Sequence, residues 1–187
     1  MPGSKRDTPF FNSGRYEEAL AALERSLALD PNNAVVWGLK STILINLGRY
    51  EEALTALERS LTLNPNDVNM EFGHAMMLFN LGRDQEALAA LDHILALDPN
   101  NVEAWDSKAN YLASVKRHDE ALAALDHVLT LNPNNPGAWL SRARSLFILG
   151  RLQEAQLAVD HALALNPYDA DASKLKASIL QLLNQMQ

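Results

Sequence analysis

The chain repeats its own pattern every 34 residues, and this period constrains the fold more than any other feature of the sequence. Proline and alanine keep the period through five copies, and glycine keeps it in four, with Lys116 in the remaining place. A period of this length indicates an array of repeats, in which no single repeat can bury its own apolar face. The recurring residues are Pro31, Pro65, Pro99, Pro133 and Pro167; Ala19, Ala53, Ala87, Ala121 and Ala155; and Gly14, Gly48, Gly82 and Gly150.

Each repeat is predicted to contain two helices joined by a short turn. In residues 34–67, Trp37, Ser41, Leu44 and Leu47 recur at intervals of three and four, which places them on one face of a first helix. Gly48 follows, and glycine closes a helix in the left-handed conformation without a Cβ clash. Glu51 and Glu52 then lie in the first turn of a second helix, where the helix dipole favours carboxylates, and Pro65 ends that helix. Short connections make the two helices antiparallel neighbours.

The ends of the first helices carry two local predictions. Lys116 stands where the other repeats have glycine, and a left-handed conformation there would cost about 1 kcal/mol. An asparagine or aspartate precedes every first helix, and both residue types are good N-caps. These expected caps are Asn33, Asp67, Asn101, Asn135 and Asp169.

This pattern resembles the tetratricopeptide repeat in the form common in prokaryotic proteins, and the resemblance covers about residues 10–184. It implies an all-α fold, a right-handed α-solenoid of antiparallel helix pairs, with first helices lining a concave groove and second helices on the convex side. It also implies a non-catalytic scaffold that binds peptides or partner proteins. The residues that carry it are Trp37, Gly48, Tyr50, Ala53 and Pro65.

The repeats divide the chain as a single domain, residues 1–187. Residues 10–33 match only the end of a first helix and a complete second helix, and residues 170–187 match a first helix that we expect to act as a C-terminal cap. The segments are 1–9 outside the repeats, 10–33 as partial repeat 1, 34–67 as repeat 2, 68–101 as repeat 3, 102–135 as repeat 4, 136–169 as repeat 5, and 170–187 as the capping helix.

Composition narrows the function classes. The formal net charge of −7 disfavours non-specific binding to nucleic acid or to an anionic membrane. No run of eighteen apolar residues is present to span a membrane, and the first residues lack the apolar core of a secretory signal. The absence of cysteine excludes disulfides and thiol chemistry. We expect a cytoplasmic protein.

Three histidines share one repeat position, which raises the question of a metal site. His93, His127 and His161 each follow an aspartate. Equivalent positions in successive repeats are separated by about 10 Å, the spacing of packed helices, whereas zinc needs all its ligands near 2 Å from one point. A solvated convex surface is therefore favoured over a metal site, and His74 and His118 have no evident ligand partners.

The sequence offers no constellation of catalytic residues. Paired carboxylates at 17–18 and 51–52 sit where second helices begin, which explains them without acid–base chemistry. No glycine-rich phosphate loop, nucleophile elbow or zinc-protease motif is present. We predict that the chain is not an enzyme and binds no cofactor.

One basic and one acidic position recur in every repeat. The seventh position is Lys40, His74, Lys108, Arg142 or Lys176, and the twenty-fifth is Glu24, Glu58, Asp92, Asp126 or Asp160. The favoured interpretation is that the basic stems cover the edge of the core while their charged ends pair with the acidic row. The alternative is a basic strip for an acidic partner.

The groove carries the functional prediction. By resemblance, positions 2, 5, 9 and 12 of each first helix face the concave surface. Phe72, Met76 and Phe79 form an apolar stripe there, and methionine suits adaptable binding surfaces. Phe79 and Phe147 have the alternative of packing between first helices. The candidates are Val35, Gly38, Thr42, Ile45, Asn69, Phe72, Met76, Phe79, Glu103, Asp106, Asn110, Leu140, Arg144 and Phe147.

These candidates favour a peptide or helix with apolar anchors, and a basic residue opposite Glu103 and Asp106. The lysines and asparagines with which some family members hold a carboxylate are absent at the matching positions. The alternative function is a structural spacer or self-assembling piece of a longer solenoid, with no groove ligand. With either function, we expect Leu20, Leu23 and Leu27 to lack part of their cover, and we expect the N-terminal end to associate with another copy.

Overall fold

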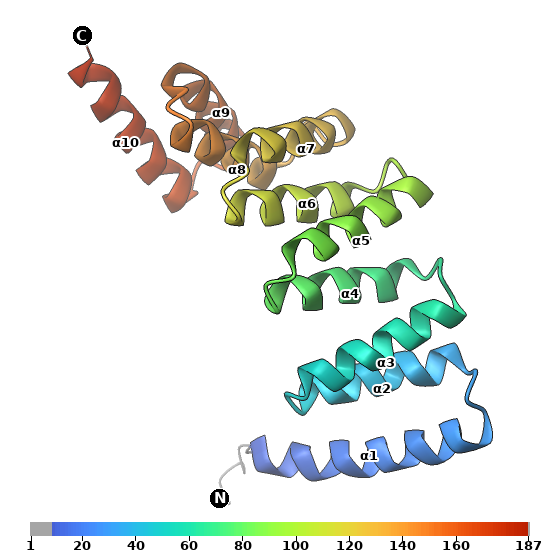
Figure 1. The fold of residues 1–187 in the computed structure, drawn as a ribbon. Coiled ribbons are helices and arrows are strands. Elements are labelled where there is room, and N and C mark those ends of the chain that lie inside the picture. The colour runs from blue at the N-terminus through green and yellow to red at the C-terminus, as the bar shows by residue number, and fades with distance from the viewer. Residues whose placement is uncertain (1–8, 187) are drawn as a thin grey trace, which may run out of the picture. The chain divides into compact units, whose positions relative to one another are not determined.

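The computed structural model describes residues 9–186, and among these residues every regular element is a helix (Figure 1). It consists of two compact units, one up to Ala90 and one from Leu91, whose boundary falls inside α5. Residues 1–8 of the predicted non-repeat segment lie outside the described residues. The helices are α1 (Pro9–Leu29), α2 (Ala34–Asn46), α3 (Tyr50–Leu63), α4 (Val68–Asn80), α5 (Asp84–Leu97), α6 (Val102–Ser114), α7 (His118–Leu131), α8 (Pro136–Ile148), α9 (Leu152–Leu165) and α10 (Ala170–Gln185).

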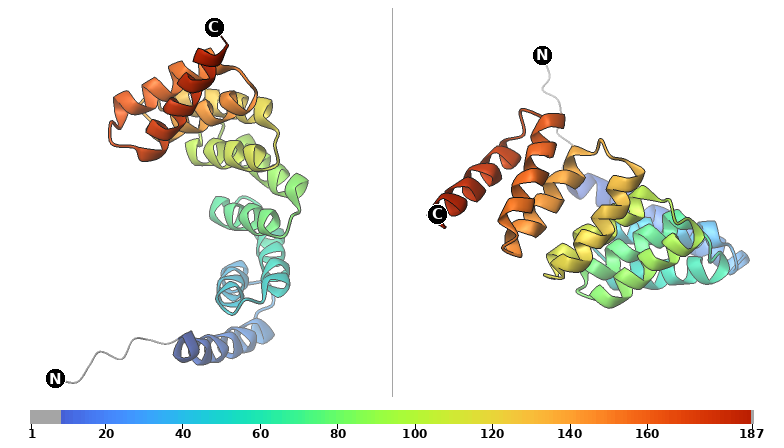
Figure 2. Two further views of the ribbon diagram at one scale, coloured as in Figure 1. Left: turned by 90° about the vertical axis from the view of Figure 1, so that its left-hand side faces the viewer. Right: turned by 90° about the horizontal axis from the view of Figure 1, so that it is seen from above.

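Helices that are neighbours in sequence pack against each other within each unit. In the first unit α2 packs closely on α3, and α1 and α4 pack on the two sides of this pair. In the second unit α6 packs on α7 and α8 on α9, while α7 contacts α8 and α9 contacts α10 (Figures 1 and 2). The predicted all-α architecture of helix pairs is confirmed. In each unit a first helix contacts two second helices: α2 contacts α1 and α3, and α8 contacts α7 and α9.

The predicted N-caps are all present. The side chains of Asn33, Asp67, Asn101 and Asn135 each accept a hydrogen bond from the backbone N–H three residues later, at 3.0–3.2 Å. Asp169 accepts from the N–H groups of Asp171 and Ala172. Each cap satisfies a donor that would otherwise lack a partner in the first turn of a helix.

The turn between the two helices of a repeat has one conformation throughout. Gly48, Gly82 and Gly150 have φ of 72°, 74° and 75°, and Lys116 adopts the same left-handed conformation with φ of 65°. The N–H of Lys116 donates to the carbonyl of Ala113, and the next N–H donates to Leu112. These two bonds close the C-terminus of the helix, and the chain can then reverse to start the second helix.

An arginine follows every left-handed residue and holds a glutamate three residues later. In repeat 2, the guanidinium of Arg49 donates two hydrogen bonds of 2.6 Å to the carboxylate of Glu52. These bonds hold the pKa of Glu52 below its ordinary value. Arg83 with Glu86, Arg117 with Glu120, and Arg151 with Glu154 make the same pair.

The first repeat differs from the expected helix–turn remnant. Gly14 lies inside the continuous helix α1, without the positive φ of the other turn glycines. In complete repeats the turn allows a first helix to fold back and bury its apolar face. Only residues 10–13 match a first helix here, so a turn would bury little. A continuous helix keeps its backbone hydrogen bonds instead.

Small and branched residues fill the space between helices. Ala53, Ala121 and Ala155 are fully buried, which lets the helices approach closely. Ile94 and Val128 replace a smaller residue near the end of the second helix, and both are fully buried as well. Across residues 9–186, no helix is both long and apolar enough to cross a membrane.

Candidate functional site

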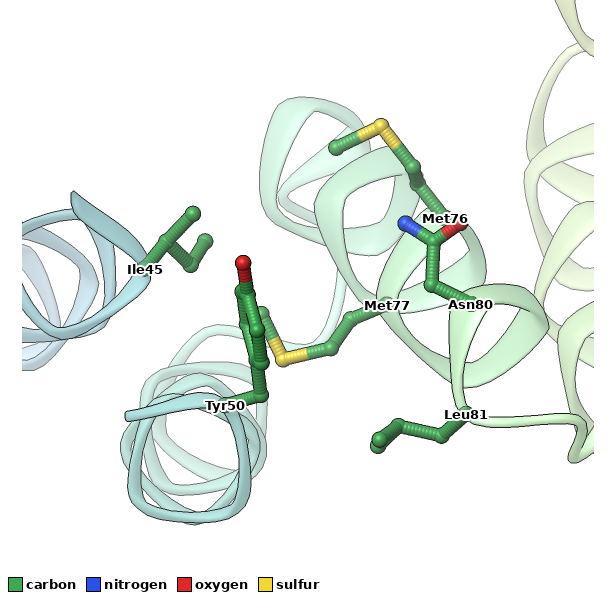
Figure 3. Close-up of a pocket in the computed structure, with 6 residues that line it drawn as sticks. All are labelled: Ile45, Tyr50, Met76, Met77, Asn80 and Leu81. Carbon is green, nitrogen blue, oxygen red and sulfur yellow. The ribbon is translucent and has the colours of Figure 1, made fainter. Parts of the chain in front are cut away.

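A small apolar pocket lies beside the turn of repeat 2 in the first unit (Figure 3). Its volume is about 250 Å³. One wall comes from the end of α2 and the start of α3, and the other comes from α4 in the next repeat. Figure 3 shows the ring of Tyr50 standing between Ile45 and the side chains of α4. The lining residues are Ile45, Tyr50, Met76, Met77, Asn80 and Leu81.

The repeat geometry produces this pocket. The left-handed turn at Gly48 brings Tyr50 beside Ile45, and successive turns of α4 place Met76 and Asn80 on one face. Met77 is buried in the core, whereas Met76 is 50% exposed and Tyr50 is 53% exposed. The pocket therefore combines a fixed floor with two large side chains that remain open to solvent.

A second pocket occupies the equivalent place in the second unit, at the junction of repeats 4 and 5. Its volume is about 220 Å³, and it is lined by α6, α7 and α8. The same repeat positions line both pockets. The second pocket has Ala113, His118, Arg144, Ser145 and Ile148 where the first has Ile45, Tyr50, Met76, Met77 and Asn80. The second pocket therefore adds a histidine and an arginine to a lining that is still mostly apolar.

His118 and Arg144 give the second pocket its chemical character. His118 is 9% exposed, and its Nδ1 atom has no hydrogen-bond partner among the described residues. The guanidinium of Arg144 contacts the carboxylate of Asp171 on α10 at 2.8 Å. This pocket therefore offers the Nδ1 atom of His118 for hydrogen bonding, and the guanidinium of Arg144, which already pairs with Asp171.

Sequence comparison identifies the family. Residues 11–137, more than half of the chain, match the family described as the cytochrome c-type biogenesis protein H TPR domain. A second family, the tetratricopeptide repeat, matches residues 107–179. The chain is a tetratricopeptide repeat protein. No curated protein matches it in sequence.

Solved structures of other tetratricopeptide repeat proteins share the fold. MamA has a TM-score of 0.75 at 21% identity, over 89% of this chain and 99% of that chain. YrrB, described as a TPR protein with an unusual peptide-binding site, has a TM-score of 0.76 at 22% identity, over 89% of this chain and 86% of that chain. A tetratricopeptide repeat protein from Parabacteroides merdae has a TM-score of 0.78 at 19% identity, over 94% and 70%. These likenesses confirm the α-solenoid fold class.

The two pockets bring together four of the predicted groove residues. Ile45 and Met76 line the first pocket, and Asn110 and Arg144 line the second. The other ten predicted groove residues differ in how exposed they are. Val35, Thr42, Asn69 and Glu103 are exposed; Phe72, Phe79, Asp106 and Phe147 are half-buried; and Gly38 and Leu140 are buried.

Gly38 and Leu140 have structural surroundings that explain their burial. A Cβ atom on Gly38 would lie 2.9 Å from the sulfur of Met70, so the space beside this glycine is filled by α4. Leu140 belongs to the core cluster of the second unit, and Phe147 packs against the same cluster. Because the chain's own side chains cover Gly38 and Leu140, these two residues are not accessible to a partner.

Asp106 and Asn110 form a polar pair one turn apart on α6. The amide of Asn110 donates to the Asp106 carboxylate at 3.1 Å. Partial burial raises the pKa of Asp106 above its ordinary value, and the hydrogen bond from Asn110 partly opposes this rise. Burial thus disfavours the ionised form of Asp106, which is one of the two acidic residues expected on this part of the first-helix surface.

Four of the pocket residues were not among the predicted groove positions. Tyr50, Met77, Asn80 and Leu81 lie at or near the turn between first and second helices. A search limited to the groove-facing positions of first helices cannot include them, since Tyr50 belongs to a second helix. The signal was present, because tyrosine after the Gly-Arg turn is one of the residues that carried the family resemblance.

The charged rows pair as the favoured interpretation predicted. In each repeat the basic residue of the first helix contacts the acidic residue sixteen positions earlier, on the second helix of the preceding repeat. Lys40 contacts Glu24 at 3.1 Å, and Lys176 contacts Asp160 at 2.7 Å. Lys108 likewise pairs with Asp92, and Arg142 pairs with Asp126. The ring of His74 lies 3.9 Å from the carboxylate of Glu58, a contact that is an ion pair only when the histidine is protonated.

The tryptophans on these first helices organise the same edge. Lys40 lies 5.5 Å from the ring of Trp37, and Lys108 lies 5.4 Å from the ring of Trp105. The ring of His127 stacks on Trp105 with centroids 4.0 Å apart, and His161 stacks on Trp139 at 4.5 Å. These two histidines are exposed, as expected, but they also hold the two helices of one repeat together.

Proposed function

We propose that the chain is a non-catalytic protein-interaction scaffold that receives an apolar side chain of a partner peptide or helix in the first-unit pocket. The observation that carries this proposal is the exposure of Met76 and Tyr50 beside Ile45. Large apolar side chains normally gain stability by burial in a core. Here they line a cavity open to solvent, where they could receive an apolar anchor residue of a partner.

The size of the pocket favours a side chain over a small-molecule ligand. Its volume of about 250 Å³ lies below the range of roughly 300–1,000 Å³ that holds drug-sized molecules. Methionine adapts its shape to different partners because it has three rotatable bonds and a polarizable sulfur. The pocket therefore suits a partner's leucine, methionine or phenylalanine.

One anchor accounts for only part of an interaction. Burying one large apolar side chain contributes about 1.5–3 kcal/mol, whereas a micromolar complex needs about 8 kcal/mol. The remainder would come from neighbouring exposed residues of the first helices, such as Thr42 and Asn69.

The structural relatives support this proposal through one description. YrrB is described as a tetratricopeptide repeat protein with an unusual peptide-binding site. We transfer to the present chain only the expectation that it binds a peptide.

Selection of peptides tests the proposal. A random peptide library would be selected against the immobilised 187-residue chain, and the recovered peptides measured by calorimetry. We expect them to share an apolar residue. A Met76→Asp variant should weaken their binding at least tenfold, because a carboxylate would face the anchor in the pocket.

The matched control is Leu157→Asp, a large exposed residue on α9 that lines neither pocket. It should leave the affinity unchanged. Failure to select any peptide, or peptides that bind Met76→Asp as well as the original chain, would remove the pocket from the proposed function.

A further inference from the structure

The helix α1 lacks the cover that every complete repeat gives its second helix. Ala22 is exposed and Leu23 is half-buried. The equivalent residues of α3, α7 and α9 are at most 2% exposed, because the first helix of the same repeat lies over them. These equivalents are Ala56, Ala124 and Ala158 for the alanine, and Leu57, Leu125 and Val159 for the leucine.

An apolar groove marks the place where that first helix is missing. It has a volume of about 340 Å³ and runs between α1 and α2. Leu39, on its α2 side, is 52% exposed. The groove is lined by Ala19, Ala22, Leu23, Leu39, Thr42 and Ile43. Among the described residues, none lies over this groove as a first helix.

The helix α10 is a first helix that no second helix of its own repeat covers among the described residues. It packs on α9 through Ala172 and Ile179, as a first helix packs on the preceding repeat. Its other apolar face is open, since Ala177 is exposed and Leu180 is 37% exposed. The equivalent residues of α2, α6 and α8 are at most 2% exposed, because their own second helices cover them: Ser41, Ala109 and Ala143, and Leu44, Leu112 and Leu146.

We propose that α10 of one copy of the chain docks in the α1–α2 groove of a second copy. A first helix without a second helix would meet a second helix without a first. The contact would complete one repeat, with the same packing that already joins α2 to α3, α6 to α7 and α8 to α9. The interface is thus a continuation of one that the chain forms three times within itself.

Individual residues at the two ends match a complete repeat. In repeat 2 the hydroxyl of Ser60 donates to the carbonyl of Ala34 at 2.8 Å, which ties the end of the second helix to the start of the first. Ser26 occupies the position of Ser60 on α1, and Ala170 occupies the position of Ala34 on α10. The joined repeat would therefore repeat this hydrogen bond between copies.

A second copy supplies a helix of the kind that the groove lacks. α10 has 16 residues, with the residue pattern of a first helix. Because the two surfaces differ, each copy keeps one free end after pairing, and the contact leads to chains or rings of copies instead of closing at a dimer.

The experiment measures the mass of the full 187-residue chain by sedimentation and light scattering, from micromolar to millimolar concentration. We expect the mass-average to rise continuously past that of a dimer. Two variants block one end each: Ala22→Arg on α1 and Leu180→Arg on α10. Both positions are exposed, so both variants should fold, which circular dichroism and thermal unfolding would verify. Leu157→Arg, on the exposed face of α9, is the control and should associate like the original chain.

Mixing the two blocked variants provides the decisive result. Each variant alone should stay monomeric. The mixture should reach about twice the monomer mass and stop there, because one variant keeps a working α10 and the other keeps a working groove. A monomer at millimolar concentration, association that survives Ala22→Arg, or a mixture that stays monomeric would overturn the proposal. Met76→Asp should leave the mass unchanged, so this test is independent of the peptide pocket.

Discussion

At the scale of single residues, the turn at Lys116 shows the repeat geometry prevailing over local preference. Three repeats have glycine at this point. Their φ values of 72–75° lie in the left-handed region, where a Cβ atom clashes with the backbone. Lys116 adopts φ of 65° in the same two-bond helix ending. The packing of α6 on α7 thus holds a lysine in a conformation that lysine disfavours.

Replacing Lys116 with glycine should stabilise the chain. We expect Lys116→Gly to raise the free energy of unfolding by about 1 kcal/mol, the usual cost of a left-handed side-chain residue. Urea unfolding monitored by circular dichroism would measure it. Gly150→Ala is the converse control and should lose a similar amount. An unchanged or lowered stability for Lys116→Gly would show that the lysine side chain makes compensating contacts.

Asp106 predicts a pH dependence of stability. Burial raises its pKa in the folded chain, so the folded state favours the protonated form. Its stabilising contribution is present below the ordinary carboxyl pKa and is lost as the pH rises through the folded value. Asp106→Asn, which stays neutral, should therefore be more stable than the original chain at pH 7, and the difference should vanish in acid.

Thermal unfolding across the acidic range would measure this difference. In a companion experiment, Asn110→Ala should raise the pKa of Asp106 further in an NMR titration, because the opposing hydrogen bond is removed. A stability difference that is constant with pH would show that ionisation of Asp106 has no part in it.

At the scale of helices, the ion pairs add a second link between helices that a short turn already joins. Each pair joins the second helix of one repeat to the first helix of the next, sixteen residues along. Lys40, Lys108 and Arg142 are largely covered while their acidic partners are about half exposed, whereas Lys176 and Asp160 are equally exposed. They therefore contribute to the register between repeats more than to total stability.

A double-mutant cycle on Lys40 and Glu24 would measure this contribution. We expect Lys40→Gln and Glu24→Gln to show a coupling of about 0.5 kcal/mol. The coupling should fall at high salt, since the pair is accessible to ions. Zero coupling at low salt would mean that the contact is incidental and that Lys40 acts through Trp37 alone.

The sequence predicted helices well because their signals are local. The caps at Asn33 and Asp67 and the turn at Gly48 follow from residue chemistry within a few positions. The continuous helix through Gly14 did not follow, because whether a turn forms there depends on what the folded-back segment would bury. Gly38 was placed in the groove by register, but its burial depends on Met70, which comes from another helix.

At the scale of the whole molecule, a repeat array exposes two kinds of surface: the face along its first helices and the faces at its two ends. The first-unit pocket belongs to the first kind, and the open sides of α1 and α10 belong to the second. Periodicity predicted the first kind only in outline, since Tyr50 and Asn80 complete the pocket from outside the expected positions. An open surface was anticipated at α1 but not at α10. Of the three leucines expected to lack cover on α1, Leu20 and Leu27 are buried, and only Leu23 is half-buried.

The most direct test of the account is hydrogen exchange on the full chain with and without a selected peptide. The account predicts slower amide exchange in the C-terminal half of α2 and in α4, around Ile45 and Met76, and no slowing in Met76→Asp. Slowing confined to the second helices α7 and α9, or none at all with saturating peptide, would contradict it.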